Sequence, residues 1–456
     1  MEKSVSFSEK FNGFLKSVSN EQHLIGASLV RIGFGIHILY FYVLQIFQKD
    51  FLWGANGVYP WEVFSKDIKI DNFSIYSLSN SPVYFNIIFF TGILIGVLYL
   101  IGYKTRFIGI LNFIWIWSLY ERNPYALDGG NNILIICLFY LLFVNTSAYF
   151  SYDAMKSNNV AKQKNNRYLA LLHNFGVLAC IVQLMVLYFA SGLFKVQGKM
   201  WVHGTALYYV TQVKEYSLPS IAPLIYENPI IFTVGTYATV IFQLAFPFLI
   251  WNKRTKWLMA IGSIMFHIMI AVLMGLVAFG LAMITIDLIL FDDKSYIKLK
   301  NKLTNLNNRI KSIFNKRVQK LQQNTVIKSQ KIIVLYDGYC PMCKNVVTKL
   351  KKVDTFNLLM FKSFREYSNS EAEIGISLTT LEKRMHSRKL KEEKYVSGID
   401  SVIQICKRVP IMWGILIFLY LGKFMGIGQL TYDFIAKRRM IVPVGHCENG
   451  ICERKL

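Results

Sequence analysis

Two cysteines separated by two residues are the side chains of this sequence best suited to chemistry. Cys340 and Cys343 lie at the end of the stretch VLYDGYCPMC, residues 334–343, so an apolar run leads directly into them. A pair of neighbouring thiols can exchange with disulfides, bind a metal or pass electrons to a partner. The first use is favoured, because a Cys-x-x-Cys motif after a strand is typical of thioredoxin-like redox proteins.

The residues around the pair predict how the two cysteines differ. Asp337 and Gly338 favour a turn after the apolar run, and Pro341 suits the first turn of a following helix. Cys340 is therefore expected at a helix N-terminus, where free N–H groups and the helix dipole stabilise a thiolate. We expect Cys340 to attack the substrate and Cys343 to resolve the mixed disulfide.

Two other uses of the pair stay open. Cys340 and Cys343 would form half of a zinc site if Cys447 and Cys452 supplied the remaining ligands. The pair could also be structurally inert. The redox interpretation, with no resident metal, is preferred. A hydrolase signature such as His-Glu-x-x-His or a nucleophile elbow is absent from the sequence, so proteolysis has no motif behind it.

The composition is that of a membrane protein. Hydrophobic residues make up 54% of the 456 residues and charged residues only 17%, which is too apolar for a soluble protein of this size. The net charge is nevertheless +24. Basic segments that face the cytoplasm and meet anionic lipid explain both values. Nucleic-acid binding would also explain the charge, but no recognition motif accompanies it, and we expect no nucleic-acid partner.

The apolar runs predict an α-helical polytopic membrane bundle of about eight spans. Residues 257–291 are too long for one span, and the Gly275 to Gly280 region can turn them into a hairpin. A signal-peptide cleavage site does not follow the first run. The other six runs cover residues 24–47, 83–103, 106–120, 132–150, 168–194 and 230–250.

The sequence divides into four predicted segments. Residues 1–22 have apolar side chains at helical spacing and predict an amphipathic interfacial helix. Residues 23–292 form the transmembrane domain, and residues 293–330 form a basic, solvated and helical linker. Residues 331–456 form a small α/β domain. Its apolar run 411–430 either belongs to the core or docks on the membrane, and the core is preferred.

Charged residues in the loops predict the orientation. Loops that we place inside have an excess of Lys and Arg, whereas the loops between them are nearly balanced. This alternation puts both termini, and with them the cysteine pair, on the cytoplasmic side of the cell membrane. Cys137 and Cys180 lie in apolar runs, where we expect core packing. The inside residues are Lys104, Arg106, Lys156, Lys162, Lys164, Arg167, Lys253, Arg254 and Lys256.

A second group of polar residues lies at the predicted outer face. Lys195 is near the end of the fifth span, and Trp201 and His203 follow it. A lysine there normally extends its amine to the interface, but apolar enclosure would favour the neutral amine, which can act as a base. The same face has three further candidate substrate-binding residues at the start of the fourth span, namely Asp128, Asn131 and Asn132.

His267 is the other catalytic candidate of the membrane domain. It lies well inside the seventh span. An ionisable residue at such a depth is a functional hypothesis by default, although a hydrogen bond to a neighbouring helix would satisfy it equally well.

The C-terminal segment resembles the DCC family of thiol–disulfide oxidoreductases across nearly all of residues 331–456. The resemblance implies a thioredoxin-like cytoplasmic domain with Cys340 and Cys343 as the redox couple and Asp337 as the third residue of the motif. A proline clearly placed in the cis position that faces the cysteines of thioredoxins is missing. The matching stretches are 336–343 (YDGYCPMC), 397–401 (SGIDS), 408–410 (RVP), 432–439 (YDFIAKRR) and Cys447.

Residues 22–291 resemble the horizontally transferred transmembrane domain, a relative of the membrane part of vitamin-K-dependent γ-carboxylase. The matching residues are Gly192, Lys195, the turn 201–204 and His267. The resemblance implies that Lys195 is the base towards a hydroquinone, so a quinone or hydroquinone is the candidate cofactor. Ile133 stands where the carboxylase has a histidine, and the large lumenal portion is absent, so glutamate carboxylation is not expected.

Residues 128–131 (DGGN) and 201–209 (WVHGTALYY) are also similar to the membrane subunits that mature sporulation-delaying peptide toxins. This resemblance implies a secreted peptide precursor as a partner. Three interpretations follow. The first is a membrane-anchored thiol–disulfide oxidoreductase with a redox partner protein and a lipophilic or peptide ligand. The second is a maturation or export factor with an accessory redox domain. The third is a transporter or scaffold without chemistry in the membrane domain.

Overall fold

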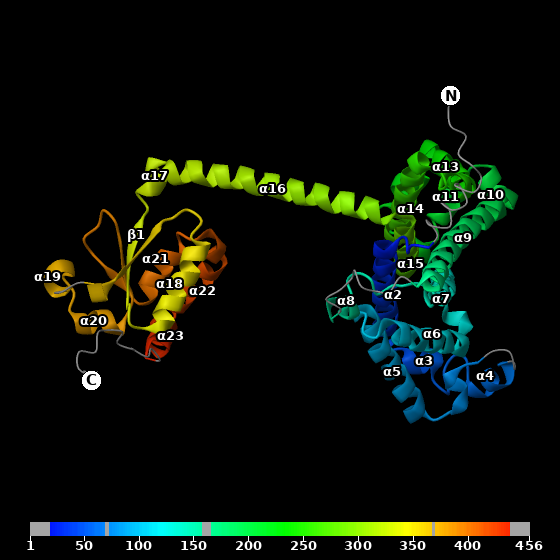
Figure 1. The fold of residues 1–456 in the computed structure, drawn as a ribbon, viewed down its shortest axis with the longest axis horizontal. Helices are drawn as coiled ribbons and strands as arrows, with labels where there is room; N and C mark the ends of the chain where they lie inside the picture. Colours follow the sequence, from blue (N-terminus) through cyan, green and yellow to red (C-terminus); the bar gives the residue numbers. More distant parts are fainter. Residues whose placement is uncertain (1–18, 69–72, 157–165, 367–369, 438–456) are drawn as a thin grey trace. The chain divides into compact units, whose positions relative to one another are not determined.

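The computed structural model describes residues 19–68, 73–156, 166–366 and 370–437 and divides the chain into two compact units, Met1–Lys300 and Asn301–Leu456 (Figure 1). The predicted interfacial helix falls almost wholly on residues 1–18, outside the described part. Cys447 and Cys452 lie outside it as well.

The first unit is helical, and each of the eight predicted spans corresponds to a helix. These helices are α2 (Leu24–Gln45), α5 (Pro82–Ile101), α6 (Thr105–Arg122), α7 (Gly129–Leu141), α9 (Arg167–Gln197), α13 (Pro229–Leu249), α14 (Lys253–Leu273) and α15 (Val277–Asp287). Shorter elements connect them, with η denoting 3₁₀ helices: α3 (Lys49–Trp53), α4 (Trp61–Asp67), η1 (Ile75–Leu78), η2 (Pro124–Ala126), α8 (Tyr152–Lys156), α10 (Lys199–Val202), α11 (Ala206–Val210), η3 (Lys214–Tyr216), α12 (Ala222–Tyr226) and η4 (Leu288–Leu290).

Five of these helices are long and apolar enough to cross a bilayer, namely α2, α5, α9, α13 and α14. Helix α7 and the α15–η4 segment are apolar but shorter. Helix α6 has 18 residues, and the charges of Arg106, Glu121 and Arg122 lower its hydropathy. The first unit is therefore a multi-pass membrane domain, and the count of eight spans stays a prediction.

Buried contacts hold the membrane unit together. Helix α15 packs against α2, α7 and α14. Arg31 of α2 is fully buried, and its guanidinium donates to the carbonyls of Tyr99, Thr146 and Phe150 at 2.8 to 3.1 Å. These bonds satisfy a charge that would otherwise be costly at this depth. Cys137 and Cys180 are fully buried, which confirms their predicted packing role.

Helix α16 (Asp293–Gln323) is the predicted linker. Asp293 accepts hydrogen bonds from the backbone N–H groups of Leu24 and Ile25, at 3.1 and 2.7 Å, so the start of α16 lies beside the start of α2. Val318 is the single buried residue of this fully described helix. Exposed apolar side chains recur along α16 at intervals of three and four residues, namely Leu299, Leu303, Leu306, Ile310 and Ile313. The linker is thus helical, as predicted, and one of its faces is apolar.

The second unit contains a four-stranded mixed sheet with the order β2-β1-β3-β4. The strands are β1 (Ile332–Tyr336), β2 (Leu359–Ser363), β3 (His386–Lys389) and β4 (Val396–Ser397). Strand β1 pairs in parallel with β2 and antiparallel with β3, and β3 pairs antiparallel with β4. The helical elements are α17 (Thr325–Lys328), α18 (Pro341–Val353), η5 (Phe364–Glu366), α19 (Ser370–Ile374), α20 (Leu378–Lys383), α21 (Ile399–Cys406), η6 (Pro410–Met412), α22 (Trp413–Phe424) and α23 (Ile427–Ala436).

Strand β1 lies inside the sheet, between β2 and β3, and both of its faces are buried. Ile332 and Val334 belong to one hydrophobic cluster, and Ile333 and Leu335 belong to another. Alternate side chains of a strand point to opposite faces of the sheet. A continuous apolar run was therefore the correct signal for a strand covered on both sides.

The preferred core position of residues 411–430 is wrong. Helices α22 and α23, all of whose residues are described, contain no buried residue. The Phe418 side chain is 73% exposed and that of Phe424 is 92% exposed. The two helices meet at 105° and together are apolar enough for a broken span or a re-entrant segment, which would be a sixth candidate. Docking on the membrane, the alternative interpretation, stays a prediction.

Candidate functional site

The cysteine pair occupies the predicted strand–turn–helix segment. Strand β1 ends at Tyr336, and Cys340 is the N-cap residue of α18, with Pro341 in the first turn. The backbone N–H of Cys343 donates to Cys340 Sγ at 3.4 Å. This contact is an N-cap in which sulfur replaces the usual side-chain oxygen. The helix N-terminus therefore directs a donor at the first sulfur, as the sequence predicted.

The two sulfurs differ in exposure. The Cys340 side chain has 0% of its surface exposed, whereas Cys343 is partly exposed. Neither cysteine forms a disulfide in this structure. The predicted roles, with Cys340 as the attacking sulfur and Cys343 as the resolving one, stay a prediction.

Asp337 holds the turn that precedes the pair. Its carboxylate accepts a forked pair of hydrogen bonds from Arg365, whose Nε lies 3.0 Å from Oδ1 and whose Nη2 lies 2.8 Å from Oδ2. The Tyr339 backbone N–H also donates to Oδ1 at 2.9 Å. Bonding to Asp337 raises the pKa of Arg365 above its usual value. These bonds fix the turn that precedes Cys340, and the predicted catalytic role of Asp337 stays a prediction.

An apolar cavity of about 250 Å³ opens beside Cys343. Asp337 and Arg384 contribute polar groups, and Tyr432 and Ile435 of α23 line it as well. Most of the lining is apolar and comes from α18, the sheet and the helices that follow it, namely Leu335, Met342, Val346, Val347, Phe364, Leu381, Met385, Val402 and Ala436. The cavity borders Cys343, and Cys340 is not among its lining residues.

A metal-binding cluster is not evident in the described part of the chain, where no three His, Cys, Asp or Glu side chains gather. The zinc alternative required Cys447 and Cys452, which are outside that part. Cys406 on α21 is a further free thiol. It is buried, and burial raises the pKa of its thiol above the usual value. Cys406 is therefore less reactive than an exposed thiol.

In the membrane unit, the structure brings Lys195 and Trp201 together. The Lys195 ammonium lies 5.0 Å from the centroid of the Trp201 ring, across the turn between α9 and α10. This distance is within the range of a cation–π contact. His203 follows α10 as its C-cap residue and is exposed.

Asp128 and Asn131 form a capping box at the start of α7. Asp128 Oδ1 accepts from the backbone N–H groups of Gly130 and Asn131 at 2.8 and 3.0 Å, and Asn131 Oδ1 accepts from the Asp128 N–H at 3.0 Å. The Asn131 amide also donates to the Tyr120 hydroxyl at 2.8 Å. Asn132 is exposed. These bonds explain the DGGN motif as a helix start, and a substrate-binding role stays a prediction.

His267 belongs to a buried polar cluster that joins three helices. Its Nε2 lies 2.7 Å from the Tyr188 hydroxyl of α9. That hydroxyl also bonds to Ser263 of α14, and Ser263 donates to Asp287 Oδ2 of α15. Two buried polar atoms of this cluster lack a hydrogen-bond partner in the described structure, namely His267 Nδ1 and Asp287 Oδ1. The structural alternative to a functional role for His267, a hydrogen bond to a neighbouring helix, is thus present. This bond leaves the other ring nitrogen, Nδ1, without a partner in the described structure.

Sequence reasoning missed Tyr188, Ser263 and Asp287. Asp287 could have been found from the sequence, because it is the one carboxylate in the apolar segment 277–290. An acid in such a segment is rare and usually functional. Tyr188 and Lys195 lie seven residues apart on α9, so they share one face of the helix, about 10 Å apart along its axis. The hydroxyl of Ser263 gave no signal of its own.

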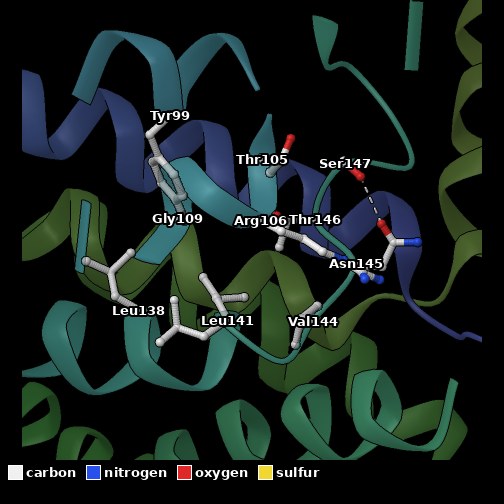
Figure 2. Close-up of a pocket in the computed structure, with 11 residues that line it drawn as sticks. Tyr99, Thr105, Arg106, Gly109, Leu138, Leu141, Val144, Asn145, Thr146 and Ser147 are labelled. Atoms are coloured by element: carbon white, nitrogen blue, oxygen red, sulfur yellow. Dashed lines mark hydrogen bonds between the residues drawn. The ribbon is translucent and has the colours of Figure 1, made fainter. Parts of the chain in front are cut away.

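A small cavity elsewhere in the membrane unit has a different character. Figure 2 shows its lining, which includes Tyr99, Thr105, Leu138 and Leu141, and the hydrogen bond of 3.1 Å from Ser147 to Asn145. Its volume is about 20 Å³, which is room for about one water molecule. This cavity is too small for a lipophilic cofactor.

Comparison with protein families agrees with both predicted resemblances. The model of the HTTM domain matches residues 23–295, which is more than half of the chain. The chain belongs to the HTTM-domain family. A second model, the DCC1-like thiol-disulfide oxidoreductase, matches residues 334–443 of this HTTM-domain protein. That region contains the end of strand β1, both cysteines and the residues that line the cavity. The chain therefore combines an HTTM domain with a DCC1-like domain.

Two curated relatives come from Bacillus subtilis (strain 168). The sporulation-delaying protein SdpB is 30% identical over 209 residues, which cover 44% of this chain and 62% of SdpB. The uncharacterized protein YitO is 26% identical over 218 residues, which cover 46% of this chain and 69% of YitO. No solved structure matches the chain.

Proposed function

We propose that this protein is a membrane-anchored thiol–disulfide oxidoreductase in which Cys340 and Cys343 are the redox couple. The observation that carries the proposal is the contact between the Cys343 N–H and Cys340 Sγ at the N-terminus of α18. A donor at a helix N-terminus favours the thiolate, which is the reactive form in thiol–disulfide exchange. The match to the DCC1-like oxidoreductase model over residues 334–443 supports the same chemistry.

The reaction transfers two electrons. When the dithiol reduces a substrate disulfide, a bond forms between Cys340 and Cys343, the substrate S–S bond breaks, and the substrate leaves as two thiols. The same steps in reverse oxidise a substrate dithiol. Asp337 and Arg365 fix the turn before the pair and act as positioning residues.

A thioredoxin-like fold is part of the proposal. The order of elements supports it, because β1, α18 and the parallel strand β2 are followed by the antiparallel strands β3 and β4 and by helix α21. This arrangement places the cysteines at the end of the central strand, where α/β folds commonly hold their reactive groups. The described residues contain no cis peptide bond.

We propose eight spans with both ends of the membrane domain on the cytoplasmic face. The bonds from Leu24 and Ile25 to Asp293 support this topology, since they join the first residues of the first span to the residue that follows the last span. A chain that leaves where it entered has crossed an even number of times. The inside loops carry the excess of Lys and Arg that the cytoplasmic face of the cell membrane requires.

Helix α16 is proposed to lie on the anionic cytoplasmic surface of the bilayer. Its exposed apolar stripe begins at Leu299 and continues through Ile313. Residues 294–331 carry eleven Lys or Arg and no acid. An apolar stripe with basic flanks is typical of interfacial helices. Two such stripes would pair poorly in a coiled coil, because like charges would face each other without acidic partners.

The membrane unit is proposed to bind a lipophilic ligand of the quinone type or a peptide. Lys195 over Trp201 and the unsatisfied His267 Nδ1 and Asp287 Oδ1 support this, since each offers a polar group to an oxygen of a largely apolar ligand. A quinone, when bound, supplies two-electron chemistry. Lys195 and His267 would then hold or move its hydroxyl protons.

A second candidate function is maturation of a secreted peptide, with the redox domain accessory to it. The similarity to the sporulation-delaying protein SdpB favours this function. The test is mass spectrometry of secreted peptides from cells with and without the gene. The second function predicts one peptide that changes in length or disulfide state on deletion. Unchanged secreted peptides would contradict it.

The redox proposal is tested with the full-length protein in detergent and glutathione disulfide as the substrate. The wild type is expected to form glutathione from the disulfide in successive turnovers when a dithiol reductant regenerates it. The Cys340→Ser, Cys343→Ser double variant is expected to lose this activity. Cys406→Ser is the matched control, because Cys406 is a buried thiol outside the cavity lining, and it should retain the activity. Activity in the double variant would overturn the proposal.

A further inference from the structure

Helices α22 and α23 present an extended apolar surface. All residues of both helices are described, and none of them is buried. At about 100° per residue, the exposed apolar side chains of α22 spread over more than half of its circumference. They include Trp413, Ile415, Ile417, Phe418, Leu421 and Phe424. A patch of this extent is unusual on a soluble protein and marks a contact with another protein or with a membrane.

The two helices form a sharp elbow that is built into the sequence. They meet at 105°. Gly426 takes a φ of +73°, and a Cβ at Gly428 would lie 3.0 Å from the carbonyl carbon of Gly422, so glycine is favoured at both positions. Helix α22 has 12 residues and is about 18 Å long, which is too short to cross a hydrocarbon core of about 30 Å. An elbow of this size can enter one leaflet and return, but it cannot span the bilayer.

One face of α23 is bound to the rest of the unit. The Tyr432 hydroxyl accepts a hydrogen bond from the Met385 backbone N–H at 2.8 Å, and Gln429 accepts one from the first N–H of α21 at 3.1 Å. Asp433 forms an ion pair of 2.6 Å with Arg384. These three residues of α23 lie at positions i, i+3 and i+4, which share one face of a helix. The polar face of α23 is therefore fixed on the domain, and its other face is turned outwards.

The outward side of the elbow carries no unpaired charge. Ile427 and Leu430 are exposed on α23. Residues 413–436 contain two charged side chains, Lys423 and Asp433. Lys423 pairs with Asp400 of α21, and Asp433 has the ion pair described above, so both charges bond back to the unit. Charges beside an apolar medium are tolerated when they are paired in this way.

A lipid bilayer fits this surface better than a protein does. A protein partner covers one face of a helix, whereas a helix that is apolar on most sides belongs in a core or in a bilayer. The two helices together are apolar enough for a membrane segment, and the first unit of the same chain is a membrane domain. Lys407 precedes the elbow and residues 437–439 (KRR) follow it, which complements anionic head groups.

We infer that the α22–α23 elbow is a re-entrant docking element that inserts the bend around Phe424 into one leaflet of an anionic bilayer, while the polar face of α23 stays on its domain. The inference does not depend on the proposed redox function. Its consequence for the cysteine site is positional. Helix α23 contributes Tyr432, Ile435 and Ala436 to the cavity lining, so docking holds one wall of that cavity at the membrane surface.

The first test identifies what contacts the bend. The photo-cross-linking residue p-benzoylphenylalanine replaces Phe424 in the full-length protein, which is reconstituted in nanodiscs of phosphatidylcholine and phosphatidylglycerol. Leu390 is the matched control site, because it is an exposed apolar residue in a charged stretch, residues 389–394 (KLKEEK). After illumination, mass spectrometry should find at least about tenfold more acyl-chain adducts at position 424 than at position 390.

The identity of the adducts decides between the occupants. A cross-link from position 424 to a second copy of the chain, or to residues 438–456 of its own chain, in place of lipid would overturn the inference. Equal amounts of lipid adduct at the two sites would overturn it as well, because a charged loop does not enter the hydrocarbon core.

The second test uses Phe424→Asp and amide hydrogen exchange in the same nanodiscs. The Phe424 side chain is 92% exposed, so it contributes little within the protein, and lipid contacts should account for most of the effect of the change. Exchange of residues 413–436 should rise several-fold, because a charge at the bend opposes insertion. Exchange in β1 should stay unchanged, which shows that the domain remains folded.

Leu390→Asp is the control for the exchange measurement and should leave residues 413–436 at the wild-type rate. Unchanged exchange in Phe424→Asp, or an equal rise in lipid-free detergent, would contradict the inference.

Discussion

The two units of this protein hold their reactive groups in different ways. In the membrane unit, Tyr188, Asp287 and His267 are at most 2% exposed. Tyr188 bonds to His267 directly, and Ser263 links Tyr188 to Asp287. In the C-terminal unit, one sulfur is equally buried, but its partner Cys343 borders a cavity of about 250 Å³.

This difference bears on what each site can meet. A closed cluster accepts a ligand only after its helices move apart, whereas a cavity is open without such a movement. The cysteine pair thus has one sulfur beside a cavity, whereas the buried cluster is enclosed and ties α9, α14 and α15 together.

The largest expected effect is a loss of disulfide reduction when the cysteine site is changed, with little effect when the membrane cluster is changed. Cys343→Ser should abolish catalytic reduction of a disulfide by the full-length protein, because Cys340 and Cys343 can then no longer form a disulfide with each other. Tyr188→Phe removes one hydroxyl from the membrane cluster and should leave the same activity within about twofold, as surface and distant changes usually do. The measurement is glutathione release under a common reductant. Loss of activity in Tyr188→Phe would show that the two sites depend on each other.

A stability measurement tests whether the membrane cluster is structural. Asp287→Ala leaves the Ser263 hydroxyl without its acceptor and should destabilise the protein by about 1–3 kcal/mol. The readout is the thermal unfolding midpoint in detergent, which should fall. Asp287→Asn is the matched control, since it keeps an acceptor oxygen of similar shape, and it should stay closer to the wild type. An unchanged midpoint in Asp287→Ala would mean that the cluster does not hold the helices together.

Helix α16, which follows the membrane domain in the sequence, should be protected by anionic lipid. In proteoliposomes with anionic lipid, we expect trypsin to cleave at Arg309 and Lys311 several-fold more slowly than with zwitterionic lipid. Leu306→Asp should remove the protection, because it places a charge in the apolar stripe. Asn308→Asp makes the same change of charge on the opposite face and is the control. Equal cleavage in both lipids would contradict the interfacial position.

The smallest expected effect concerns the ion pair between Arg384 and Asp433. Arg384 lies just before β3 and Asp433 lies on α23, so the pair connects these two elements at the edge of the cavity. Hydrogen bonds from Arg384 lower the pKa of the Asp433 carboxyl below its usual 3.8. The stabilisation is therefore fully present above pH 3.8 and is lost as the pH falls through the lower folded pKa. Pepsin cleavage within α23 should increase over that window.

Arg384→Gln is the control for this pH effect. It removes the ion pair, so pepsin cleavage of α23 should no longer depend on the titration of Asp433 and should resemble the acidic wild type throughout. An identical pH profile in the variant and the wild type would show that the pair does not hold α23.

The cysteine site could be predicted because a few contiguous residues encode it. An apolar run, Asp337, Gly338, Cys340 and Pro341 each have a local conformational preference, and these preferences agree. The exposure of the two sulfurs could not be predicted, because it depends on how the rest of the unit packs around the start of α18. Local spacing thus identified the pair, but it carried no information on the burial of each sulfur.

The membrane cluster, in contrast, could not be predicted from the sequence. Tyr188, Ser263 and Asp287 lie on three helices and meet only in the folded structure. The sequence offered no spacing to connect them. The predicted core position of helix α22 was wrong for a third reason. A helix that is apolar on all sides is equally compatible with a protein core and with a bilayer. Its exposed Phe418 and Phe424 decide against the core.

The central claim, that Cys340 and Cys343 form a reversible redox couple, is tested most directly by a redox titration. The full-length protein is equilibrated in glutathione buffers of increasing oxidised fraction, and thiols are counted by mass-tagging of the peptide that contains both cysteines. We expect the two thiols to disappear together in one two-electron step and to return on reduction. Two thiols that persist across the whole range, or a tag count that falls by one, would contradict it.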